Sequence, residues 1–136
     1  MLTGNSAVLG GAIACASTNG PPEIANCTIT ANSALVGGGA IYCNGDSPTI
    51  RNCVISGNSA LSGGAIYSHN AGNPVITNCT ITANTASDSA GAIYCYKASN
   101  LTINNCILWG DTAANASEIL VGNLGAPTSV RFHTVT

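Results

Sequence analysis

The stretch Asn26-Cys27-Thr28-Ile29-Thr30-Ala31-Asn32 is the first of four related segments along the chain. Close copies occupy residues 52–58 and 78–84, and a degenerate copy occupies residues 105–111. The cysteines of these segments are Cys27, Cys53, Cys79 and Cys106, which gives a period of roughly 26 residues. A period of this length is typical of repeat proteins in which each unit stacks on its neighbours.

Two further signatures recur between these segments. A Gly-Gly-Ala-Ile signature occupies residues 10–13, 38–41 and 63–66, and it returns as Ala-Gly-Ala-Ile at residues 90–93. An isoleucine also stands just before the Asn-Cys pair, at Ile50, Ile76 and Ile103. Apolar and polar residues alternate with a period of two, as in Cys79-Thr80-Ile81-Thr82, which indicates strands and not helices. Each unit is therefore predicted to hold three short strands separated by turns.

A unit of this size cannot bury its own apolar face, so successive units must stack and pair their strands in parallel, about 4.8 Å apart. The predicted fold is an all-β parallel β-helix (β-solenoid), one domain over residues 1–136, with about five coils of roughly 26–27 residues and three strands per coil. Asn32, Asn58 and Asn84 are expected at turns, where asparagine tolerates a left-handed backbone and its amide can bond the next coil. The Gly-Gly pairs mark corners that need unusual dihedral angles or close backbone approach.

Gly-Gly-Ala-Ile followed by an Ile-x-x-Asn motif resembles the short repeats of polymorphic outer-membrane proteins and related bacterial surface proteins. The resemblance covers nearly the whole chain and implies a right-handed β-helix in an extracellular or cell-surface setting, with a structural or adhesive role. The second motif of that family usually has phenylalanine where this chain has Leu2, Ile29, Ile55, Ile81 and Leu108. These repeats form a scaffold, so the resemblance implies no catalytic residue.

Charge and hydropathy exclude two classes of partner. Charged residues make up 6% of the chain, the net charge is −2, and the only cations besides histidine are Arg51, Lys97 and Arg131. A basic surface for nucleic acid is therefore not expected. No apolar run approaches the length of about 18 residues that crosses a bilayer, so no membrane insertion is expected either.

The seven cysteines fall into two columns. Cys15, Cys43 and Cys95 follow the Ala-Ile signature, where the remaining unit has Ser68, and the second column is Cys27, Cys53, Cys79 and Cys106. Each first-column cysteine is followed by a second-column cysteine in the same unit. This pattern favours disulfides Cys15–Cys27, Cys43–Cys53 and Cys95–Cys106, with Cys79 free and the protein in an oxidising compartment. The alternative is that the cysteines are small core side chains stacked as thiol ladders.

The acidic residues offer no pair for catalysis. The five carboxylates are distributed one per coil, at Glu23, Asp46, Asp88, Asp111 and Glu118. Glycoside hydrolysis needs two carboxylates within about 10 Å, and lyase chemistry needs a carboxylate cluster that binds calcium. Cys-x-x-Cys is absent, and neither His69 nor His133 has a suitably spaced partner. The protein is therefore predicted not to be an enzyme and to need no metal or cofactor.

Two outward columns could contact a ligand. Tyr42, Tyr67 and Tyr94 follow the inward isoleucine in successive units and could form a platform for glycan rings, or they could be cross-strand pairs that stabilise the sheet. Thr-x-Thr at residues 28–30, 80–82 and 134–136 is similar to the ice-binding face of some β-solenoids. Val54 and Trp109 interrupt this column, and the strand propensity of exposed threonine also explains it.

The two ends of the chain are in the same phase of the repeat. Leu2, Ile29, Ile55, Ile81, Leu108 and Val135 align at the same position of successive units. Uncapped end coils would leave strand edges unpaired, so the chain is expected either to be a fragment of a longer β-helix or to pair with other copies. The residues expected at the pairing ends are Leu2, Thr3, Asn5, Thr134, Val135 and Thr136. The leading hypothesis is a structural extracellular protein that stacks head to tail into fibres; a glycan-binding adhesin fragment and an ice-binding protein are the alternatives.

Overall fold

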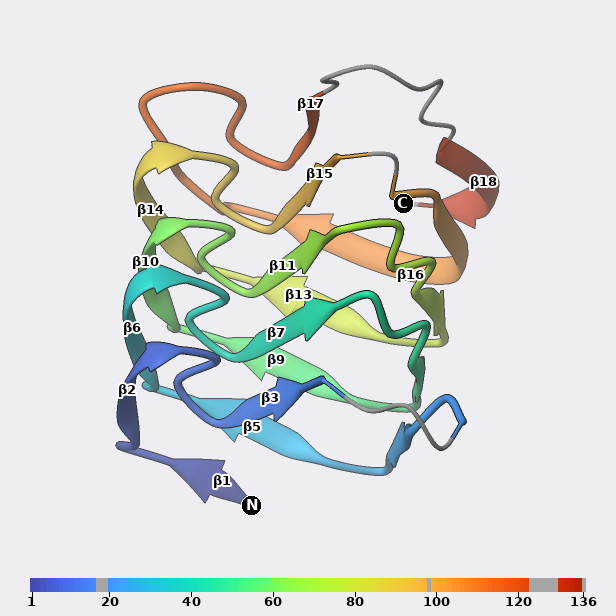
Figure 1. The fold of residues 1–136 in the computed structure, drawn as a ribbon, viewed down its shortest axis with the longest axis horizontal. Helices are drawn as coiled ribbons and strands as arrows, with labels where there is room; N and C mark the ends of the chain where they lie inside the picture. The colour runs from blue at the N-terminus through green and yellow to red at the C-terminus, as the bar shows by residue number, and fades with distance from the viewer. Residues whose placement is uncertain (17–19, 98, 123–129, 136) are drawn as a thin grey trace.

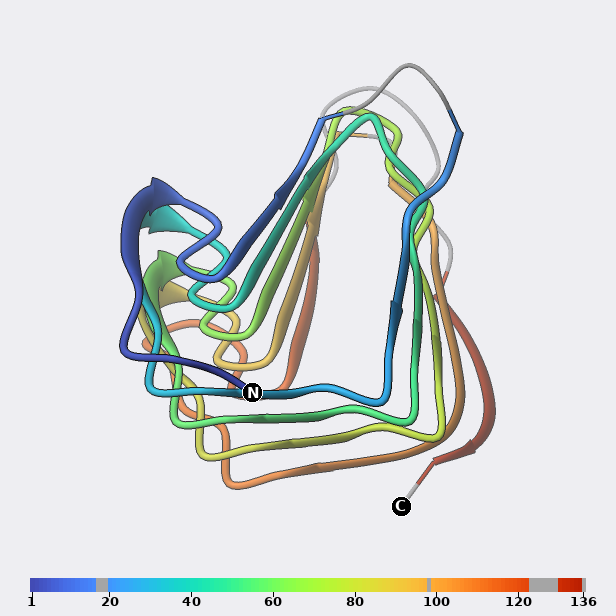
Figure 2. The same ribbon diagram turned by 90° about the horizontal axis from the view of Figure 1, so that it is seen from below.

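The chain forms a solenoid of short strands. The computed structural model describes residues 1–16, 20–97 and 99–122, together with the backbone of residues 130–135. These residues contain strands and turns, and none of their segments forms a helix that could cross a membrane. The chain winds from the N-terminus at the bottom of Figure 1 to the C-terminus near the top, and Figure 2 shows the successive turns lying over one another.

Strands of successive turns pair in parallel and form four faces, named here sheets A to D. Sheet A contains β1 (Leu2–Thr3), β5 (Thr28–Thr30), β9 (Val54–Ser56), β13 (Thr80–Thr82) and the end of β16 (Leu101–Trp109). Sheet B contains β2 (Ser6–Leu9), β6 (Ser33–Gly37), β10 (Ser59–Ser62) and β14 (Thr85–Ser89). Sheet C contains β3 (Ile13–Cys15), β7 (Ile41–Asn44), β11 (Ile66–His69), β15 (Ile93–Tyr96) and β17 (Ile119–Gly122). Sheet D contains β4 (Glu23–Ala25), β8 (Thr49–Arg51), β12 (Val75–Thr77), the start of β16 and β18 (Val130–Val135).

Each of the first four turns therefore has four strands, one more than the sequence predicted. The predicted strands correspond to sheets C, D and A, and the additional strand is the one in sheet B. In β6, Ala34 is buried, whereas Leu35 is 74% exposed and Val36 is 43% exposed. These solvent-facing apolar residues hide the alternation of apolar and polar residues by which the other strands were recognised.

The register of sheet A confirms the repeat alignment through the first four turns. Leu2 pairs with Ile29, Ile29 with Ile55, Ile55 with Ile81, and Ile81 with Leu108. Four turns separate Leu2 from Leu108, and β17 and β18 carry the chain into a fifth. The inward isoleucines of the interior turns are fully buried in all three predicted sheets: Ile29, Ile41, Ile50, Ile55, Ile66, Ile76, Ile81, Ile93 and Ile103. The predicted parallel β-helix, with one unit of the repeat in each coil, is confirmed.

The two glycines of each Gly-Gly pair meet different requirements. The first has a positive φ, between 62° and 65° at Gly10, Gly38 and Gly63, and Ala90 adopts 54° at the same position. The second lies against the next turn, because a Cβ added to Gly39 or Gly64 would overlap the carbonyl oxygen of the equivalent glycine there. The expected unusual dihedral angle is thus found at the first glycine of each pair, and the expected close backbone approach is found at the second.

A ladder of buried asparagines, named here the inner ladder, links the turns between sheets A and B. The Nδ2 atom of Asn32 donates to Oδ1 of Asn58 at 3.0 Å, and Nδ2 of Asn58 donates to Oδ1 of Asn84 at 2.9 Å. The predicted amide contacts between coils are thus confirmed. The predicted left-handed backbone at these asparagines is wrong, because the positive φ belongs to the preceding residue, as at Ala31 (54°) and Gly57 (61°). That turn directs each asparagine side chain inward.

Candidate functional site

The predicted tyrosine column lies on the outer face of sheet C. Tyr42, Tyr67 and Tyr94 are successive Cα partners in β7, β11 and β15, and all three are half-buried. His69 and Tyr96, one outward position further along the strands, extend the column. The structure therefore assembles a continuous aromatic surface that the sequence pattern outlined only in part.

The rings of this surface cover one another. Tyr67 and Tyr94 are stacked, with centroids 5.0 Å apart and planes inclined by 20°. Tyr42 meets Tyr67 edge-on at 5.6 Å, and His69 stacks on Tyr96 at 5.6 Å. Burial within this cluster raises the pKa of Tyr67 to about 12. Because stacked neighbours cover their faces, Tyr67 and Tyr94 offer a sugar ring mainly edges, which favours a stabilising aromatic ladder over a glycan platform.

The threonine column on the outer face of sheet A is interrupted by apolar side chains. Val54 is 42% exposed, Ile107 is 48% exposed and Trp109 is 76% exposed. The hydroxyls between them bond one another or the backbone: Ser56 lies 3.4 Å from Thr30, and Thr82 donates to the carbonyl of Trp109 at 2.6 Å. A regular array of free hydroxyls is therefore not formed among residues 28–109, and the third predicted pair, residues 134–136, lies outside the described side chains.

The three predicted disulfides are wrong for this structure, in which all seven cysteines are free. The two columns exist, and the cysteines stack on their own column in the neighbouring turn, except that Cys95 lies between Ser68 and Val121. Cys15 is the Cα partner of Cys43 in sheet C, and the backbone N–H of Cys79 lies 3.5 Å from Sγ of Cys106. Cys79 is consequently one free thiol among seven. The alternative of stacked thiol ladders is the one that the structure supports.

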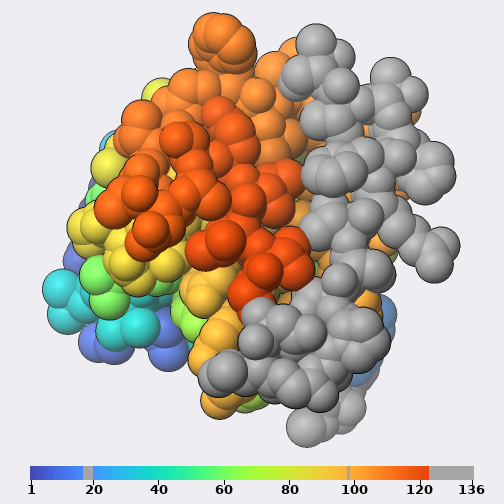
Figure 3. Space-filling view, turned by 90° about the horizontal axis from the view of Figure 1, so that it is seen from above, coloured from blue at the N-terminus to red at the C-terminus, as the bar shows by residue number. Residues whose placement is uncertain are grey.

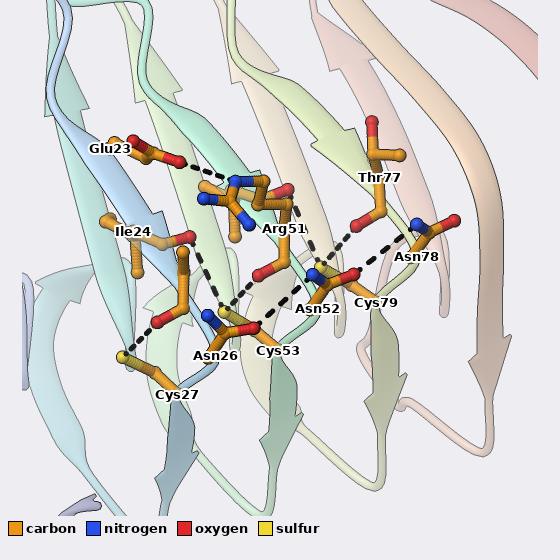
Figure 4. A network of polar contacts seen from close by, with 12 residues as sticks. Glu23, Ile24, Asn26, Cys27, Arg51, Asn52, Cys53, Thr77, Asn78 and Cys79 are labelled. Carbon is orange, nitrogen blue, oxygen red and sulfur yellow. Dashed lines mark hydrogen bonds and ion pairs between the residues drawn. The ribbon is translucent and has the colours of Figure 1, made fainter.

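Backbone carbonyls accept the thiol hydrogens of the second column (Figure 4). Sγ of Cys53 donates to the carbonyl of Arg51 at 3.2 Å, and Sγ of Cys79 donates to that of Thr77 at 3.3 Å. Beside them runs a looser, exposed row of amides, in which Asn52 donates to Asn26 at 3.3 Å. The thiols of the second column thus have hydrogen-bond partners in the backbone.

Thiol titration tests this correction. In denaturant without reductant we expect all seven cysteines to react with a disulfide reagent, because none is bonded to another. In the native protein only Cys27 should react quickly, since it is half-buried and the other six are buried. A single reactive thiol in denaturant would restore the disulfides that the sequence predicted.

The structure also places the predicted pairing ends. At the N-terminal end, Thr3 pairs with Thr30, and Asn5 donates to Oδ1 of Asn32 at 2.9 Å. At the other end, Val135 pairs with Cys106 and not with Leu108, so the predicted register of the last strand is wrong. The shift arises because seven residues separate β17 from β18, whereas four separate β15 from β16 in the turn that β18 pairs with. The side chains of Thr134 and Val135, and all of Thr136, lie outside the described residues.

Sequence reasoning missed one pair of acidic residues. Asp111 and Glu118 were assigned to separate coils, but their carboxyl groups interact at the C-terminal end of the inner ladder. Burial and contact with Asp111 raise the pKa of Glu118 to about 7. The turn at Gly110 and the irregular path of residues 112–118 bring the two carboxyls together, and no repeat position signals this. No group of three or more metal-ligating side chains and no pocket accompany the pair within the described residues.

A family model for the right-handed β-helix region matches residues 9–122. The chain belongs to the right-handed β-helix family. This match agrees with the strand order, the parallel register and the stacked turns described above, and it confirms the right-handed β-helix that the resemblance implied. Comparison with curated proteins and with solved structures gave no match. Within the β-helix family, the finer resemblance to polymorphic outer-membrane repeats stays a prediction, as does the absence of enzymatic activity.

Proposed function

We propose that this β-helix is a structural protein of an extracellular or cell-surface assembly, and that its copies stack head to tail. Sheet C carries the proposal. Its strands follow the order β3, β7, β11, β15, β17, and every pairing is parallel. Among the described residues, β3 therefore has one unpaired edge at the N-terminal end, and β17 has one at the opposite end (Figure 1).

These two edges are complementary. An unpaired strand edge presents free N–H and C=O groups that another chain can bond. Because all strands of sheet C run in one direction, β17 can offer β3 of a second copy the parallel pairing that it makes with β15. Ile13 of that copy would then continue the inward column of Ile93 and Ile119. Such a contact is heterologous and does not close, so it produces a filament.

Two features of the chain favour this role over ligand binding. The low charge, 6% of residues and a net −2, opposes close approach of two copies only weakly. The tyrosine column has its ring faces occupied by neighbouring rings. The extracellular setting is supported by the resemblance of the Gly-Gly-Ala-Ile repeats to those of surface proteins. The cysteines do not support it, because all seven are free.

A proline on the open edge of β3 tests the proposal. The N–H of Ile13 bonds the carbonyl of Ala40 in the next turn, so in an extended strand the N–H of Ala14 points to the open edge. Ala14→Pro removes this donor and leaves the hydrogen bonds between β3 and β7 in place. Ala14→Thr is the matched control, because threonine keeps the backbone N–H. In sedimentation velocity we expect concentration-dependent assemblies for the parent chain and for Ala14→Thr, and mainly monomers for Ala14→Pro. A parent chain that remains monomeric through the micromolar range would refute the proposal.

A further inference from the structure

The inner ladder ends in a carboxyl group where an amide is expected. Asn84 donates from both its backbone N and its Nδ2 to Oδ1 of Asp111, each at 2.7 Å. Asn32 and Asn58 make the same two donations to the next asparagine of the ladder. Asp111 thus takes the place of a fifth ladder asparagine, after Asn5 and the three buried ones.

The second oxygen of Asp111 is buried without a hydrogen-bond partner. In each buried asparagine of the ladder the equivalent atom is Nδ2, which donates to backbone carbonyls, as Asn84 does to Ile55 at 3.1 Å. An ionised Asp111 cannot donate, and its Oδ2 has no partner although the residue is only 3% exposed. A buried acceptor of this kind is unfavourable unless a proton is available to it.

The carboxyl group of Glu118 interacts with that of Asp111. The backbone N–H groups of Gly110 and Asp111 favour the ionised form of its carboxyl, which places Glu118 beside Asp111 at the end of the inner ladder. Its Oε2 is also buried and without a partner. Residues 110–122, coloured from orange to orange-red in Figure 3, spread over this end of the solenoid. Two buried carboxyl oxygens of interacting residues, Oδ2 of Asp111 and Oε2 of Glu118, are therefore both without a hydrogen-bond partner.

We propose that Asp111 and Glu118 share one proton, and that this shared proton fastens residues 112–122 to the end of the solenoid. A hydrogen bond from one carboxylic acid to the other carboxylate gives both unpartnered oxygens a partner at once. When the proton leaves, two carboxylates face each other and the last turn loosens. This device goes beyond the proposed stacking and does not depend on it.

Other charged groups near this turn have partners of their own. Asp88 on β14 accepts hydrogen bonds from Ser89 at 3.0 Å and from Asn115 at 3.2 Å. Lys97, after β15, lies over the ring of Tyr96 at 5.8 Å. Asn84, which faces Asp111 from the preceding turn, is neutral. Among the described residues, Asp111 is the ionisable group that acts on Glu118.

The sign of the pH effect follows from the direction of the shift. Glu118 in the folded chain has its pKa raised from 4.5 to about 7, so the folded state holds the proton more tightly than the unfolded state does. The stabilisation is fully present below the unfolded pKa and is lost as the pH rises through about 7. Protection of residues 112–122 should therefore fall between pH 5 and pH 8.

Hydrogen–deuterium exchange of the full chain, corrected for the intrinsic pH dependence of exchange, tests the shared proton. We expect protection in residues 112–122 to drop by about tenfold from pH 5 to pH 8, while sheet A of the central turns stays protected. In Glu118→Gln and Asp111→Asn the new side-chain amide can donate a hydrogen bond at every pH in this range. Both substitutions should therefore abolish the drop in protection. An equal drop in these variants would overturn the proposal, as would a parent chain without one. Restoration of protection at pH 8 by calcium would also overturn it, because the carboxyls would then hold a cation.

Discussion

Replacing Gly64 with alanine is expected to destabilise the protein by at least about 3 kcal/mol, whereas replacing Gly57 should change stability by less than about 1 kcal/mol. At Gly64 a Cβ would overlap the carbonyl oxygen of Gly91 and the backbone of Thr85 in the next turn. Backbone on both sides is fixed by strand pairing, so the turns would have to separate. We expect this to be among the most damaging single substitutions in the chain.

Gly57 is the matched control because its backbone is the more unusual of the two. It has a φ of 61°, yet Ala31 and Ala83 occupy the same position of neighbouring turns at 54°. The nearest atom to an added Cβ is 3.9 Å away. Urea denaturation followed by circular dichroism gives both values. Equal effects of the two substitutions would show that the close approach of turns at the Gly-Gly corner is not what holds glycine there.

Removal of one inner-ladder amide should have a comparable effect. We expect Asn58→Ala to destabilise the protein by about 3 to 5 kcal/mol, because it leaves buried polar groups without partners. Asn58 accepts from the backbone N and the Nδ2 of Asn32, both at 3.0 Å. Its own Nδ2 donates to Asn84 at 2.9 Å and to the carbonyl of Ile29 at 3.1 Å. Asn58 is only 1% exposed, so bulk solvent does not reach the groups that lose their partners.

The exposed amide row provides the comparison. Asn52 lies in a row with contacts of 3.3 and 3.4 Å, and its φ of 53° suits glycine. Asn52→Gly should therefore lower stability by less than about 1 kcal/mol in the same urea experiment. If Asn58→Ala were as mild as Asn52→Gly, the inner ladder would not be a principal source of stability.

Repetition explains why the fold could be predicted from the sequence. One motif that returns once per coil requires parallel in-register stacking, and the inward Ile29, Ile55 and Ile81 follow directly from it. Sheet B escaped prediction because Leu35 and Val36 turn apolar side chains to solvent. The strand's own alternation therefore carried no signal. The neighbouring turns, and not local pattern, create that strand.

The errors at the cysteines and carboxyls have a common physical origin. In a solenoid, a side chain meets its equivalent in the next turn more readily than a side chain across its own coil, so matched cysteines formed columns and not bridges. Cys15 beside Cys43 is one example. Asp111 and Glu118 could not be paired from the sequence because they meet where the repeat ends. Position within a repeat predicts contacts only while the repeat continues.

Electron cryomicroscopy of the concentrated protein tests the central claim, head-to-tail stacking, most directly. We expect filaments one solenoid wide, with a layer spacing of about 4.8 Å and a subunit repeat of about 25 Å from five stacked layers. Strand β3 of each copy should pair with β17 of the preceding copy, so that sheet C continues from one copy to the next. Single particles with β3 and β17 ordered and unpaired, at every concentration examined, would contradict the account.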